Sequence, residues 1–209
     1  MTIIIHRVVA SAFVLALASV PALAHHPMGG ATPSTFGAGL LSGLGHPIIG
    51  LDHLAAVLAV GALAAISARG FAVATAFLAA MIGGVVLHLM STALPAAEIL
   101  VGLTTALMGL LVALRFRSSL ITLAALFAIA GLAHGYALGE AVVGAEPAPV
   151  GAYLAGLFVI QTVIAGGAYL ATASLADAGA RRTAALALSG GIVMIAGGIT
   201  AASAAGFLG

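Results

Sequence analysis

Charged residues and cysteine are scarce in this chain of 209 residues. Only 5% of the residues are charged and 63% are hydrophobic, whereas a soluble domain has about 25% charged residues. This composition excludes an ordinary soluble domain. The chain has no cysteine, which excludes disulfide bonds, zinc–thiolate centres and thiol catalysis.

Clusters of charge and common catalytic motifs are also missing. The six basic residues, all arginine, and the five acidic residues are dispersed along the chain, so no basic patch could neutralise the phosphates of a nucleic acid. The sequence contains neither the H-E-x-x-H motif of zinc proteases nor a phosphate-binding G-x-x-x-x-G-K-[ST] loop. We therefore expect neither an enzyme nor a nucleic-acid-binding protein.

Long apolar runs account for most of the chain. The mean hydropathy is +1.30 and aromatic residues make up 5%, which favours an all-α integral membrane protein over a β-barrel. Six runs of about 18 to 26 residues are each long enough, at about 1.5 Å per residue, to cross the bilayer. These predicted spans cover residues 50–67, 71–93, 97–114, 120–138, 150–173 and 183–208.

The first 24 residues resemble a targeting segment. A short positive region ends at Arg7, an apolar stretch follows, and Ala22-Leu23-Ala24 is a typical cleavage site. We expect residues 1–24 to be a cleavable secretory signal peptide, with an uncleaved first helix as the alternative. Residues 25–35 would then form a short periplasmic segment, followed by a six-helix transmembrane domain over residues 36–209.

The arginines predict the orientation in the membrane. With the mature chain starting outside the cytoplasm, the first, third and fifth connections between spans lie inside. Those connections contain every arginine after the signal peptide, namely Arg69, Arg115, Arg117, Arg181 and Arg182. Because cytoplasmic loops are enriched in arginine, we expect a multi-pass protein of the bacterial inner membrane with both termini in the periplasm.

In this topology the other ionisable residues gather near the outer ends of the spans. Such groups cost up to about 2.5 to 3.5 kcal/mol each at the centre of a membrane helix, so they tend to mark a pathway or a site. Imidazoles with carboxylates suit divalent nickel, zinc and copper. The candidate ligands for a divalent cation are His46, Asp52, His53, His88, Glu98, His134 and Glu140.

The first cluster has a geometric difficulty. If Pro47 opens a helix, His46 stands at its cap and His53 returns to nearly the same face about 10 Å along the axis, with Asp52 turned about 100° away. A straight helix therefore cannot place all three on one ion. Either the chain before the helix bends inward, or Asp52 orients an imidazole without binding the ion. A helix cap with an interfacial histidine is the alternative.

The second cluster is His134-Gly-Tyr-Ala-x-Gly-Glu140, which has the same six-residue spacing from histidine to acid. Its two glycines, Gly135 and Gly139, also form a small-xxx-small face. That face is typical of close helix packing, which is an additional interpretation of the motif.

Together the two clusters resemble the HupE/UreJ family of nickel permeases. The first reads Gly-His46-Pro-x-x-Gly-x-Asp-His53, and Leu-Pro-x-x-Glu98 at the third predicted span is similar to that family too. The resemblance implies a secondary transporter or facilitator that takes up Ni²⁺, with Co²⁺ as a second candidate, for hydrogenase or urease maturation. It implies transport roles for His46, Asp52, His53, His134 and Glu140, with Glu98 as a helper.

The chain departs from the family pattern at two points. Leu138 stands where members often have a further histidine, and residues 161–167 have no Leu-His pair. His88 is a candidate replacement, its alternative being a histidine hydrogen-bonded to its neighbours. Two other functions stay open: a metal-binding accessory or sensor subunit without transport, and a haem-binding membrane anchor with axial ligands among His53, His88 and His134.

Overall fold

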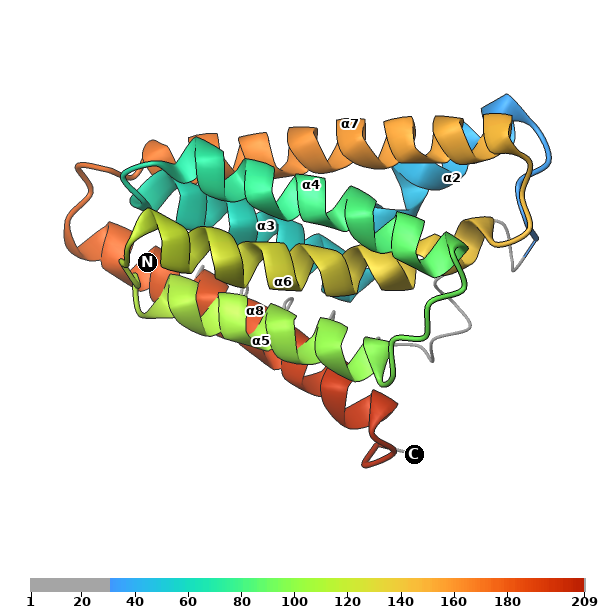
Figure 1. The fold of residues 1–209 in the computed structure, drawn as a ribbon. Helices are drawn as coiled ribbons and strands as arrows, with labels where there is room; N and C mark the ends of the chain where they lie inside the picture. The colour runs from blue at the N-terminus through green and yellow to red at the C-terminus, as the bar shows by residue number, and fades with distance from the viewer. Residues whose placement is uncertain (1–30, 209) are drawn as a thin grey trace.

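The computed structural model describes residues 31–208, and the segments of regular structure there are all helical (Figure 1). The predicted all-α class is confirmed for these residues, while the predicted signal peptide lies outside them. The elements are α2 (Phe36–Ile49), α3 (Leu51–Ile66), α4 (Gly70–Leu89), α5 (Ala97–Ala113), α6 (Leu120–Gly139), the short 3-10 helix η2 (Glu140–Val142), α7 (Pro147–Ala173) and α8 (Ala180–Ala204).

Several of these helices are long and apolar enough to cross a membrane, which makes the chain a multi-pass membrane protein. Four meet that test by themselves, namely α4, α6 together with η2, α7 and α8. The pair α2 and α3 meets it jointly, as a span broken by a bend of 80°. The third predicted span, residues 97–114, corresponds to α5, which is apolar but only 17 residues long.

The assumed role of Pro47 as the first residue of a helix was wrong, although the predicted start of the first span at residue 50 is close to the start of α3 at Leu51. Pro47 does not open a helix; it lies near the end of α2, and His46 is inside that helix. A helix starts before Pro47 because Thr35 acts as its N-cap. The Thr35 side chain accepts a hydrogen bond from the backbone N–H of Ala38 at 3.1 Å. The chain is thus already helical at Pro47, and the break follows at Gly50.

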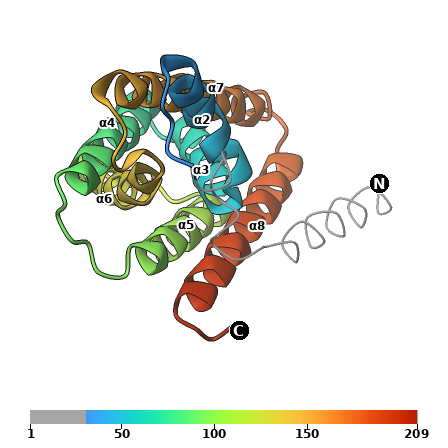
Figure 2. The ribbon, with the colours of Figure 1, turned by 90° about the vertical axis from the view of Figure 1, so that its right-hand side faces the viewer.

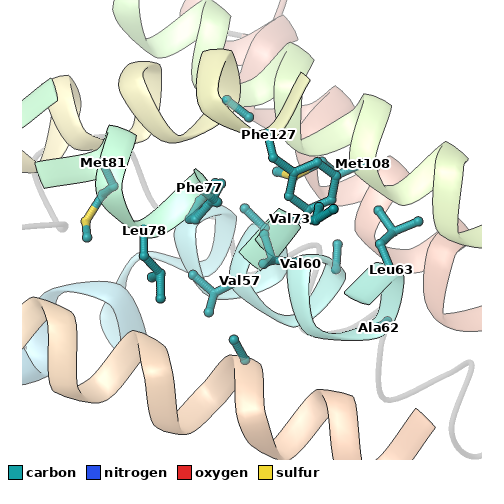
Figure 3. Close-up of a cluster of buried hydrophobic side chains, with 14 of the residues drawn as sticks. Val57, Val60, Ala62, Leu63, Val73, Phe77, Leu78, Met81, Met108 and Phe127 are labelled. Carbon is teal, nitrogen blue, oxygen red and sulfur yellow. The ribbon is translucent and has the colours of Figure 1, made fainter. Parts of the chain in front are cut away.

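Helix α3 is the centre of the bundle. Eleven of its 16 residues are buried, and it contacts α2, α4, α5, α7 and α8. Viewed from the end, the other helices surround it (Figure 2). Its apolar side chains meet those of neighbouring helices in the hydrophobic core shown in Figure 3, which includes Val57, Val60, Leu63, Val73, Phe77, Met108 and Phe127.

Glycines allow the helices to pack closely. The most extensive helix pairings are α4 with α6, α5 with α8, and α2 with α7. In the first pairing, a Cβ atom at Gly135 would collide with the backbone carbonyl of Met81, and one at Gly139 would lie 2.8 Å from Cβ of His88. The packing interpretation of these two glycines is therefore confirmed.

All arginines of residues 31–208 gather at one end of the bundle. The α3–α4, α5–α6 and α7–α8 connections lie together there, on the left of Figure 1. Arg115 donates to the Thr183 hydroxyl at 3.1 Å, and Arg117 and Arg182 line one cavity. We call this the arginine end; the α4–α5 and α6–α7 connections lie at the opposite end.

Candidate metal centre

Four of the predicted ligands are buried inside the bundle. His46 comes from α2, Asp52 and His53 from the first turn of α3, and His134 from α6. Each is at most 4% exposed. Because burying polar groups is costly unless other polar groups satisfy them, the contacts among these side chains define the site.

The bend between α2 and α3 brings the first two histidines together. The rings of His46 and His53 lie 5.9 Å apart, centroid to centroid, and nearly perpendicular at 89°. A straight helix would have separated them by about 10 Å along its axis. Of the two alternatives for this cluster, a bend is present, but it lies at Gly50 and not at the entry before Pro47.

The position of the bend, Gly50, has no space for a side chain. A Cβ atom there would lie 2.8 Å from Cδ2 of His53 and 3.3 Å from Oδ1 of Asp52. Any side chain at position 50 would therefore press against the His53 imidazole. The break thus needs glycine for space, because its backbone angles, φ −74° and ψ 98°, are open to other residues.

Asp52 organises the first turn of α3. Its Oδ1 accepts a hydrogen bond from the backbone N–H of His53 at 2.8 Å. A carboxylate at this position also interacts favourably with the positive end of the helix dipole. Asp52 thereby stabilises the turn that carries the His53 imidazole and adds a negative charge beside it.

His53 and His134 face each other directly. Their Nδ1 atoms are 2.9 Å apart, so one of the two nitrogens donates a proton to the lone pair of the other. Two imidazole nitrogens bound to one ion at about 2.1 Å each, as at zinc sites, would be about 3.0 to 3.4 Å apart for angles between octahedral and tetrahedral. The observed pair is within a few tenths of an ångström of that separation.

Thr105 of α5 approaches the other side of the His134 ring. Its Oγ1 lies 3.3 Å from Nε2 of His134, and its side chain is fully buried. Metal-binding imidazoles usually have such a partner on the second nitrogen, where it sets the tautomer and the ring orientation. The Phe77 ring, with its centroid 5.8 Å from that of His134, packs against the same imidazole.

Tyr153 of α7 fixes the tautomer of His46. Its hydroxyl donates to the backbone carbonyl of Leu138 at 2.6 Å, because a carbonyl can only accept. The hydroxyl oxygen, 2.9 Å from Nδ1 of His46, must then accept the Nδ1 proton. In the neutral imidazole of His46 the lone pair is consequently on Nε2.

Thr105 and Tyr153 were not among the residues predicted from the sequence. Tyr153 lies near the start of the fifth predicted span, at the same end as the histidines, so its depth was a usable signal. Thr105 had no comparable signal, since a threonine in a membrane helix most often bonds its own backbone, as Thr104 does to the Leu100 carbonyl at 2.7 Å.

The remaining predicted ligands lie outside the buried group. His88 is half-buried and donates from Nδ1 to the Tyr136 carbonyl at 2.7 Å. This contact agrees with the alternative interpretation of His88, a histidine hydrogen-bonded to its neighbours. Glu98 is half-buried at the start of α5, and Glu140 is exposed at the start of η2.

The buried histidines are linked in pairs. In residues 31–208, no three side chains among His, Cys, Asp and Glu are arranged to hold a metal ion together. His53 contacts both His46 and His134, so it stands at the centre of the chain of imidazoles. Binding one ion with three of these side chains requires side-chain rotation.

Comparison with known proteins agrees with the motifs. The family described as HupE / UreJ protein matches residues 13–200. Protein HupE of Rhizobium leguminosarum bv. viciae is 36% identical over 187 residues, which cover 88% of this chain and 92% of that protein. No solved structure matches the chain significantly. Motifs, helical fold and sequence comparison agree, and the chain belongs to the HupE/UreJ family.

Proposed function

We propose that this protein is a permease that admits Ni²⁺ from the periplasm, to supply hydrogenase or urease maturation. Its family is associated with nickel uptake for these enzymes and consists generally of transporters rather than enzymes. The observation that carries the proposal is the buried His53–His134 pair, with Nδ1 atoms 2.9 Å apart. Co²⁺ is the second candidate ion, because imidazole and carboxylate ligands suit both metals.

Binding would replace the proton that His53 and His134 share. A divalent ion would need both Nδ1 lone pairs, so this proton would move to Nε2 of its own imidazole and both rings would stay neutral. The lone pair on Nε2 of His46 would come from the neighbouring α2, and the carboxylate of Asp52 would offset the ionic charge. His88, Glu98 and Glu140, nearer the surface, would receive the ion before it reaches the buried imidazoles.

The proposed topology has six spans. The first is the broken pair α2 and α3, α5 is a short third span, and the two termini face the periplasm. The position of the arginines supports this orientation, because the positive-inside rule assigns the arginine end to the cytoplasm. A cleavable signal peptide over residues 1–24 would start the mature chain outside, and the membrane would be the bacterial inner membrane.

The membrane potential could drive uptake without a coupled ion. The sequence has no G-x-x-x-x-G-K-[ST] loop for nucleotide hydrolysis. A doubly charged ion moving inward gains about 4.6 kcal/mol per 100 mV, which corresponds to about a thousandfold accumulation. We therefore propose a facilitator or secondary transporter.

Uptake of radiolabelled Ni²⁺ at trace concentration tests the proposal. The host is a cell without its own nickel transporters, and intact protein is compared with His53→Ala at equal membrane levels. We expect uptake with the intact protein, loss of at least about tenfold with the variant, and inhibition by excess Co²⁺. A well-inserted intact protein that binds Ni²⁺ without uptake in cells or liposomes would instead be an accessory or sensor subunit.

Haem binding is tested with the same preparation. Nδ1 atoms at hydrogen-bonding distance leave no space for a porphyrin between His53 and His134. We therefore expect no Soret absorbance from protein purified out of haem-supplemented cells. A stoichiometric Soret band would replace the permease proposal with a haem anchor.

A further inference from the structure

The arginine end carries a large excess of positive charge. Its arginines are Arg69, Arg115, Arg117, Arg181 and Arg182, and Asp177 is the one acid in residues 67–69, 114–119 and 174–182. Two of the arginines have hydrogen bonds in the structure, Arg115 to the Thr183 hydroxyl and Arg182 to the Ala176 carbonyl at 3.4 Å. Both acceptors are neutral, so neither contact compensates the charge.

Two adjoining cavities open among these arginines. The larger, of about 290 Å³, is lined by Arg117 and Arg182 together with the hydroxyl-bearing Ser67 and Ser118. The second, of about 260 Å³, includes Arg69 and shares Ser67 and Ser118 with the first. The lining comes from the α3–α4 and α5–α6 connections and the start of α8, so the cavities exist only in the folded bundle.

The backbone adds positive potential to the same end. Helices α4, α6 and α8 all begin there, and the first turn of a helix presents unpaired N–H groups and a partial positive charge. The N-termini of α4 and α8 have no side-chain cap. Arginine side chains, serine hydroxyls and helix N-termini thus converge on one hollow, the combination that proteins use to bind phosphate.

We propose that the larger cavity binds the phosphate group of an anionic ligand, through Arg117 and Arg182 with the Ser118 hydroxyl as an additional donor; the Ser67 hydroxyl already donates to the Leu63 carbonyl at 2.7 Å. Each planar guanidinium group can donate two hydrogen bonds to one phosphate. Arg117 comes from the α5–α6 connection and Arg182 from the first turn of α8, so the two can approach a phosphate from different sides. Ile66 and Leu123 also line the cavity, and it opens at the end of apolar helices where lipid headgroups lie. Basic pockets at this depth bind anionic headgroups, and free phosphate shares the same chemistry.

Native mass spectrometry of the purified full chain, incubated with phosphatidylglycerol or phosphatidylcholine, tests the proposal. We expect preferential retention of phosphatidylglycerol by the intact chain and at least about fivefold weaker retention with Arg117→Gln or Arg182→Gln, since one arginine near anionic lipid contributes about a kilocalorie per mole. Ser118→Ala, which leaves the charge unchanged, should also weaken retention. Arg181→Gln is the matched control, because Arg181 carries the same charge next to Arg182 but does not line the cavity.

The outcomes distinguish a specific phosphate-binding site from nonspecific electrostatic attraction of lipid to the arginine end. The proposal would be overturned if all three arginine variants weakened phosphatidylglycerol retention equally, or if none of them weakened it. Titration of the same proteins with inorganic phosphate separates the two sources of the ligand. Phosphate binding that depends on Arg117 and Arg182, without lipid retention, would support the site with free phosphate as its ligand. Neither result depends on nickel transport.

Discussion

The Tyr153 hydroxyl lies 2.9 Å from Nδ1 of His46 and donates its own proton to the Leu138 carbonyl. This contact joins α7 to α2 and leaves the lone pair of neutral His46 on Nε2. Partners of this kind on metal-binding histidines typically change affinity by about 10- to 100-fold when removed.

Tyr153→Phe should therefore weaken Ni²⁺ binding by about tenfold or more while the protein still inserts. The phenyl ring keeps the packing but cannot accept the Nδ1 proton of His46. Calorimetric titration of purified protein with Ni²⁺ measures the loss, and the uptake assay should show a higher KM.

A double-variant cycle with His46→Ala provides the control for Tyr153. If Tyr153 acts through His46, its replacement should have little further effect once His46 is absent. Additive losses in the double variant would assign Tyr153 a packing role only. Absence of Ni²⁺ binding by the unmodified protein would contradict the proposed function instead.

Thr105→Val should weaken Ni²⁺ binding, whereas Thr105→Ser should retain it. Valine has nearly the shape of threonine but removes the hydroxyl 3.3 Å from Nε2 of His134, so that nitrogen loses its partner. We expect a loss of about tenfold in affinity for valine. Equal affinities for the valine and serine variants would show that the hydroxyl does not orient His134.

Gly50→Ala should reduce Ni²⁺ affinity more than it reduces stability. The new Cβ would lie 2.8 Å from Cδ2 of His53 and displace the imidazole that stands between His46 and His134. Thermal unfolding and Ni²⁺ titration on the same samples measure the two effects. Gly83→Ala in α4 is the control, because a Cβ there has no neighbour within 4 Å; unchanged affinity in Gly50→Ala would refute the proposed constraint.

Gly135→Ala and Gly190→Ala should separate packing from binding. Each added Cβ collides with backbone across a helix pair, Gly135 with Met81 of α4 and Gly190 with Ala113 of α5. Overpacking of this kind costs about 1 to 3 kcal/mol of stability. We expect both variants to unfold at lower temperature, but only Gly135→Ala, next to His134, to lose Ni²⁺ affinity; equal affinity losses would show that the site responds to any loosening of the bundle.

The sequence predicted much of the fold because the bilayer imposes local rules. The apolar runs correspond to helices, and the arginines do gather at one end of the bundle. The start of α2 was missed because Thr35 caps a helix well before Pro47. The role of Pro47 depended on this more distant signal, which the motif itself does not contain.

The sequence by itself determined the membrane class, the family and the motifs that carry His46, Asp52, His53 and His134. Composition and hydropathy add up along the chain, so these properties need no knowledge of neighbouring helices. Only the tertiary structure decided that Tyr153 and Thr105 join the histidines while Glu140 stays exposed. Such contacts depend on how far each helix is rotated about its axis and how closely its glycines allow it to approach another, and both are set by packing across the whole bundle.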